Sequence, residues 1–105
     1  TFFQGNGEGI SNDALQLTER SSVGDLVYFE GSILSKKFTF KGDHLLLSVD
    51  YDQNVVKVFI PNNNGAVDID NMVNENDYVR IQGILSEYQN EREVVVQSKN
   101  DVNAF

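Results

Sequence analysis

The 105-residue sequence contains no cysteine and no tryptophan, and only one histidine and one proline. Without cysteine the chain can form neither a disulfide nor a thiolate metal site, and with His44 as its single histidine a zinc site is not expected. The lack of cysteine allows a cytoplasmic location without requiring one. No apolar run approaches the roughly 20 residues of a membrane span, so we expect no membrane association. Because the chain begins with threonine rather than methionine, we expect it to be a piece of a longer protein.

Basic residues are also scarce, since 8 lysines and arginines face 16 aspartates and glutamates and give a net charge of −8. This balance argues against strong, non-specific binding to duplex nucleic acid, whose affinity comes largely from basic residues that release counterions. It does not exclude a local basic groove on an acidic body. The length and the 40% hydrophobic content indicate a single globular domain with one core.

Residues that carry catalysis do not form a recognisable constellation. No G-x-S-x-G nucleophile turn occurs, and no carboxylate pair is flanked by an apolar pocket motif. Asp50-x-Asp52-x-Asn54 resembles the start of a calcium loop, but Val55 stands where that loop requires glycine. We therefore expect no enzyme activity, no bound metal and no cofactor.

Two segments repeat one strand pattern around an internal glycine. Over residues 24–34, apolar residues alternate with polar ones, and Gly31 occupies a position on the apolar side. Residues 76–86 repeat the arrangement around Gly83. Alternation with a period of two is typical of a half-buried strand, and a glycine inside such a strand marks a bulge, a corner or a close backbone approach. Two strands bent at the same offset predict a small sheet that closes into a barrel.

The rest of the pattern predicts a hairpin, a short helix and a last strand. Strands are expected at 26–35, 44–51, 55–60, 78–87 and 93–98, with a turn at 51–54, a helix at 67–73, loops at 36–43 and 88–92, and a tail at 101–105. Residues 1–22 are expected to be a flexible leader and a lead-in, and 23–105 the folded domain. The lead-in is either strand-like or a short helix capped by Ser11 or Asn12, and we expect Leu15 and Leu17 to pack on the domain.

Three strands, a helix and two more strands, with glycines in the first and fourth strands, give the order of a five-stranded Greek-key barrel. With the sequences V-x-F-x-G-x-I, LLLSVDYDQNVVKVFI and NDYVRIQGILSEY, this order resembles the OB-fold family. Within that family, the chain is most similar to nucleic-acid-binding domains of the tRNA-anticodon-binding type and their single-domain archaeal relatives. The resemblance covers residues 23–98. It implies an all-β barrel with one short helix between the third and fourth strands.

The resemblance also implies a ligand across the outer face of the second and third strands, between the first-to-second and fourth-to-fifth strand loops. Carried over by position, the nucleic-acid-binding residues are Tyr28, Lys36, Lys37, Phe38, Phe40, Lys41, Leu46, Ser48, Lys57, Phe59, Tyr88 and Arg92. Rings on which bases stack and cations along a backbone path are what single-strand binding needs. We therefore expect a monomeric, non-enzymatic module that binds single-stranded DNA or RNA.

Several plainer interpretations of these residues remain open. Either Phe38 or Phe40 could plug the end of the barrel, and a register slip of one residue would put Phe59 in the core. The basic stretch 36–41 could be a solvated loop. Near Arg92 the sequence departs from a basic loop, because the flanking residues that would repel phosphate are Glu87, Glu91 and Glu93.

The acidic balance and the loops rich in asparagine and aspartate favour a second hypothesis. In it the domain binds a protein partner through its acidic surface or an edge strand, or is a structural part of a larger chain. A third hypothesis, a small-ligand or secreted domain of this fold, has no specific support in the sequence.

Overall fold

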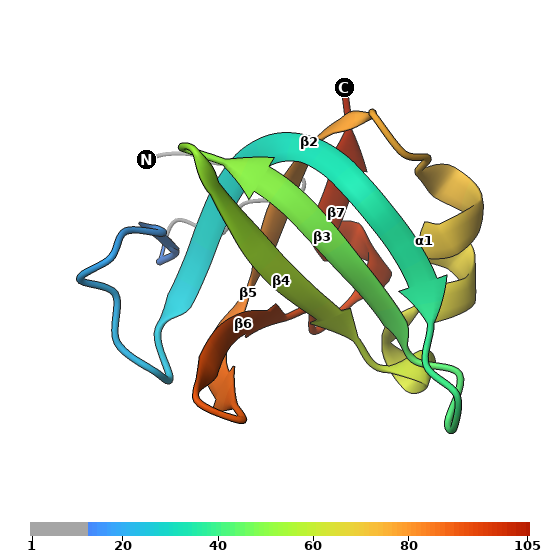
Figure 1. The fold of residues 1–105 in the computed structure, drawn as a ribbon, viewed down its shortest axis with the longest axis horizontal. Helices are drawn as coiled ribbons and strands as arrows, with labels where there is room; N and C mark the ends of the chain where they lie inside the picture. Colours follow the sequence, from blue (N-terminus) through green and yellow to red (C-terminus); the bar gives the residue numbers. More distant parts are fainter. Residues whose placement is uncertain (1–12) are drawn as a thin grey trace.

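The structure, a computed structural model, describes residues 13–105 as a barrel with one α-helix beside it (Figure 1). The predicted leader at residues 1–11 lies outside the described residues. The elements are β1 (Leu15–Gln16), β2 (Leu26–Phe38), β3 (Leu45–Tyr51), β4 (Asn54–Ile60), the 3₁₀ turn η1 (Asn62–Asn64), α1 (Ala66–Met72), β5 (Tyr78–Tyr88), β6 (Glu91–Val95), η2 (Lys99–Asp101) and β7 (Val102–Ala104). The helices among residues 13–105 all fall short of the length and apolar character of a membrane span.

Five strands close the barrel in the order β2-β3-β4-β6-β5, because β5 pairs again with β2. Neighbouring strands run antiparallel except for β4 and β6, which run parallel. The chain passes from β4 to β6 through α1 and β5, which is a Greek-key connection. The predicted five-stranded Greek-key barrel, with a short helix between its third and fourth strands, is therefore confirmed.

Both internal glycines lie where a strand changes its partner. β2 pairs with β5 along its first half and with β3 along its second half, and β5 changes in the same way from β2 to β6. Gly31 and Gly83 each immediately precede the residue that pairs with both partners. A Cβ on Gly83 would lie 2.5 Å from the carbonyl oxygen of Val95, and one on Gly31 would collide with the carbonyl oxygen of Asp50. The two bends thus need residues without side chains.

Two short strands pair with edges that the bent strands leave open. β1 pairs with the first half of β2, and β7 pairs with the first half of β5 before β5 meets β6. An open edge would leave backbone groups without partners, so the lead-in is extended rather than helical. Leu17 is buried but Leu15 is exposed, so the prediction that both pack on the domain is wrong for Leu15. The predicted tail is also wrong, because it contains β7 and buries Val102.

The predicted loops are shorter in the structure than the polar sequence suggested. β2 has a bulge after Ile33 and then pairs with β3 as far as Phe38, so residues 36–38 belong to a strand. The predicted loop at 88–92 is a two-residue turn of Gln89 and Asn90, both with positive φ, which suits a tight hairpin. In both places, pairing with the next strand of the hairpin overrides local composition.

Aliphatic side chains and Phe29 fill the barrel. The inward-facing residues of β3, β4 and β6 are buried, apart from Val56, which is partly buried. α1 covers the core with Ala66 and Ile69, whereas Met72 is 45% exposed. In the five barrel strands, the fully or nearly fully buried residues are Val27, Phe29, Ile33, Leu45, Leu47, Val49, Val58, Ile60, Val79, Ile81, Leu85 and Val94.

Candidate nucleic-acid interface

A groove of about 510 Å³ lies on the outer face of β3 and β4, where the sequence predicted a ligand. Its floor follows from the register of the hairpin, which places Leu46 beside Phe59 and Ser48 beside Lys57. These four residues alternate with core residues along their strands, so they face outward. Phe59 is therefore not a core residue. The residues that line the groove are Thr39, Leu46, Lys57, Phe59, Tyr88, Gln89, Glu91, Arg92 and Glu93.

The ring of Phe59 packs against His44, a residue for which the sequence predicted no role. The ring centroids of His44 and Phe59 lie 5.0 Å apart with a tilt of 47°. Nδ1 of His44 accepts a hydrogen bond of 3.0 Å from the backbone N–H of Asn62, which fixes the imidazole. Strand alternation could have found this residue, because His44 precedes Leu46 by two positions and so belongs to the same face.

Two lysines accompany this floor. Lys37 pairs with Leu46 across β2 and β3, so its side chain belongs to the groove side of the sheet. The Nζ of Lys57 lies 3.1 Å from Oε1 of Glu91, and both side chains are more than half exposed. An exposed ion pair of this kind is worth at most about 1 kcal/mol, so a phosphate can replace the glutamate. Lys41, exposed in the β2–β3 loop, adds a third ammonium group near this end of the sheet.

Lys36 is engaged elsewhere, although it is next to Lys37 in the sequence. Its Nζ donates hydrogen bonds of 2.7 Å and 2.8 Å to the carbonyl oxygens of Asp70 and Val73, and lies 3.1 Å from Oδ1 of Asp70. These acceptors lie at the C-terminal end of α1, where backbone carbonyls lack partners within the helix. Lys36 therefore binds the helix to the barrel and does not face the groove.

Arg92 lines the groove with part of its side chain, but its guanidinium group is directed to the lead-in. It donates hydrogen bonds of 3.0 Å, 3.2 Å and 3.4 Å to the carbonyl oxygens of Thr18, Ser21 and Glu19. The hydroxyl of Tyr51 donates a further bond of 2.6 Å to the carbonyl oxygen of Leu17. These bonds fix the segment that continues from β1, so Arg92 serves the fold here.

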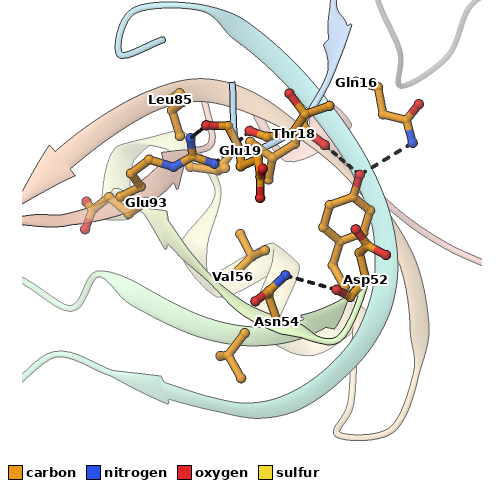
Figure 2. A pocket seen from close by; sticks show the side chains of 13 residues that line it. Gln16, Thr18, Glu19, Asp52, Asn54, Val56, Leu85 and Glu93 are labelled. Atoms are coloured by element: carbon orange, nitrogen blue, oxygen red, sulfur yellow. Dashed lines mark hydrogen bonds between the residues drawn. The ribbon is translucent and has the colours of Figure 1, made fainter. Parts of the chain in front are cut away.

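The same contacts enclose a second hollow of about 680 Å³ between the lead-in and the β3–β4 hairpin (Figure 2). Its polar groups are largely used by the fold, as the bonds from Arg92 and Tyr51 show. Arg92 is the one cation among the described residues that line it, while its carboxylates are Glu19, Asp52 and Glu93. The hollow has a larger volume than the groove, but its lining provides fewer groups that could bind an anionic ligand.

Three aromatic residues predicted in the site lie away from the floor of the groove. Tyr28 pairs with Gln82 on the wall formed by β2 and β5. Phe38 pairs with the core residue Leu45, so it belongs to the face of β2 opposite to Lys37. Phe40 plugs nothing, because it is 96% exposed in the β2–β3 loop.

Two carboxylates line the groove together with the lysines. Glu91 is paired with Lys57, as described above. Burial raises the pKa of Glu93 above its ordinary value, and the nearby Lys57 opposes this increase. No group of three or more metal-ligating side chains occurs within residues 13–105. The groove is thus a mixed surface with an aromatic floor. Lys37 lies on its β2 side, and the Lys57–Glu91 ion pair and Glu93 lie on its β6 side.

Comparisons with known proteins show likeness in structure. No protein-family model and no curated protein matches the sequence. A chain of the S. pombe Stn1–Ten1 complex has a TM-score of 0.62 at 17% identity over 76% of this chain and 57% of that chain. A chain of the replication protein A heterotrimer bound to ssDNA has a TM-score of 0.60 at 16% identity, over 94% of this chain and 70% of that chain. OBody AM1L10 bound to hen egg-white lysozyme has a TM-score of 0.67 at 13% identity, over 91% of this chain and 97% of that chain.

This chain spans little more than half of the Stn1–Ten1 chain that it resembles. At identities of 13–17%, the likeness shows a shared fold.

Proposed function

We propose that this chain, which has the OB-fold, binds single-stranded DNA or RNA along the groove over β3 and β4 and catalyses no reaction. The observation that carries the proposal is the outward ring of Phe59, which pairs with Leu46 on β3. Lys57 lies two positions before Phe59 on β4, and Lys37 lies on β2, on the other side of Leu46. A base can stack on this floor while phosphates meet the ammonium groups. Stacking contributes about 1–3 kcal/mol per base in proteins of this kind. A structure with this fold, the replication protein A heterotrimer, is described as bound to ssDNA, which supports the proposal.

Removing the ring of Phe59 is expected to weaken the binding of a short labelled oligonucleotide about tenfold or more, because one stacked base is lost. Fluorescence anisotropy of Phe59→Ala at low salt measures this loss. Phe59→Leu keeps an apolar floor without a flat ring, so it should lose most of the same affinity. Phe105→Ala removes an exposed ring beside Tyr78 and should leave the affinity unchanged. No binding by the unmodified protein at tens of micromolar would contradict the proposal.

The salt dependence of this binding is expected to be shallow, because three ammonium groups remain for phosphates: Lys37, Lys41 and Lys57. For single strands, the slope of log K against log salt is about −0.7 per phosphate contact, so we expect roughly −2. Titrations of the same oligonucleotide at several salt concentrations measure the slope, and Lys57→Ala should make it shallower by about 0.7. A slope near zero would show that phosphates are not bound.

A protein partner remains the second candidate, and one observation favours it. Glu91 and Glu93 bring negative charge into the groove of a chain that already carries a net charge of −8. OBody AM1L10, which shares the fold, is bound to a protein, hen egg-white lysozyme. Failure of every single strand to bind would favour this candidate.

A further inference from the structure

We infer that Glu93 makes the groove selective for guanine. The inference rests on the proposed function, because it concerns the base that stacks on Phe59. It begins from the second carboxylate of the groove, which, unlike Glu91, forms no ion pair with Lys57.

The register places Glu93 within reach of a base on the floor. β4 and β6 run parallel, with Lys57 opposite Glu93 and Phe59 opposite Val95. Glu93 is therefore the diagonal neighbour of Phe59 on the same outer face, and long side chains reach across such diagonals. A base that stacks flat on this outer face can present one edge to the carboxylate on the neighbouring strand.

The acceptor capacity of Glu93 is unfilled in the structure. No described residue donates a hydrogen bond to its carboxylate, and its electrostatic neighbour Lys57 forms an ion pair with Glu91 at 3.1 Å. The side chain is only partly exposed, which deprives it of some of its water. An ionised carboxylate has two oxygens that only accept hydrogen bonds. It repels phosphates, whereas the N–H donors of a base can fill its acceptors.

Guanine is the base whose hydrogen-bond donors match the two oxygens of the Glu93 carboxylate. Its Watson–Crick edge carries two adjacent donors, N1–H and the N2 amino group, which fit the two oxygens of one carboxylate. Adenine and cytosine each present one amino group beside a ring nitrogen that accepts. Thymine and uracil present one N–H between two carbonyl oxygens. These acceptors repel a carboxylate, so Glu93 favours guanine over every other base.

The test uses labelled single strands of thymidine that differ in one central base, which is guanine, hypoxanthine, adenine or thymine. We expect the guanine strand to bind about tenfold more tightly than the all-thymine strand, toward the lower end of what a bidentate base contact provides. Hypoxanthine lacks the N2 amino group and should lose most of this preference. Glu93→Gln should bring the guanine and thymine strands to equal affinity.

Glu91→Gln is the matched control, because it removes the other groove carboxylate and releases Lys57. It should strengthen the binding of all four strands alike and leave the guanine preference intact. A guanine-to-thymine ratio near one in the unmodified protein, equal binding of guanine and hypoxanthine, or a preference that survives Glu93→Gln would overturn the inference. In each case, binding of the thymine strand would leave the proposed function standing. If no strand binds, the proposed function and the inference both fail.

Discussion

Gly83→Ala is expected to lower the free energy of unfolding by roughly 2–3 kcal/mol, which is in the range for overpacked interiors. The added methyl group would lie 2.5 Å from the carbonyl oxygen of Val95 and 2.7 Å from Cγ1 of Val94. Neither can retreat easily, because both residues are paired with β5 in the barrel. Gly31→Ala should cost at least as much, since its methyl group would collide with the carbonyl oxygen of Asp50. Urea denaturation of the two variants measures both losses.

Ser32→Ala provides the control for these substitutions. Ser32 follows Gly31 in β2 and pairs with both β5 and β3, but it lies at the partly exposed outer face. Its replacement should change the free energy of unfolding by no more than about 0.5 kcal/mol. If Gly83→Ala and Gly31→Ala were as stable as this control, the bends would not depend on the close backbone approach described above.

The barrel could be predicted because its determinants are local. Alternation along a strand and a glycine on its apolar side are visible within ten residues, and two such segments suffice to predict closure. The ends of the strands are different, because they depend on which strand lies alongside. β2 extends through Phe38 because β3 is there to pair with it, and Val102 begins a strand because the first half of β5 has an open edge. The residues around Phe38 and Val102 give no signal for either strand end.

The candidate site also has a part that local sequence signals predict and a part that they do not. Leu46 and Phe59 were placed on its floor by alternation, which is a local signal. The engagement of each cation was not predictable, because its partners lie far along the chain. Arg92 meets carbonyl groups of the lead-in more than 70 positions earlier, and Lys36 meets the end of α1. The sequence assigned one role to these two residues and to Lys37. In the structure, the charged groups of Lys36 and Arg92 are bound to backbone carbonyls, whereas no described residue binds the amine of Lys37.

The neighbours Lys36 and Lys37 therefore provide a sharp test. Replacing Lys36 should lower stability without changing the affinity for oligonucleotides, and replacing Lys37 should lower the affinity without changing stability. Lys36→Met removes two hydrogen bonds from a charged donor to carbonyls at the end of α1, at a side chain only 23% exposed. We expect the free energy of unfolding to fall by about 2 kcal/mol, and the affinity for oligonucleotides to stay the same at temperatures where the variant is folded.

Lys37→Met should leave the free energy of unfolding within about 0.5 kcal/mol of the unmodified protein, because no described residue forms an ion pair or hydrogen bond with its amine. It should weaken oligonucleotide binding several-fold and make the salt dependence shallower by about 0.7, which is the share of one phosphate contact. Urea denaturation measures the free energy of unfolding of both variants, and anisotropy titration measures their affinity for the oligonucleotide. The reverse pattern, with Lys36→Met impaired in binding and Lys37→Met impaired in stability, would contradict the assignment of these residues to the helix and the groove.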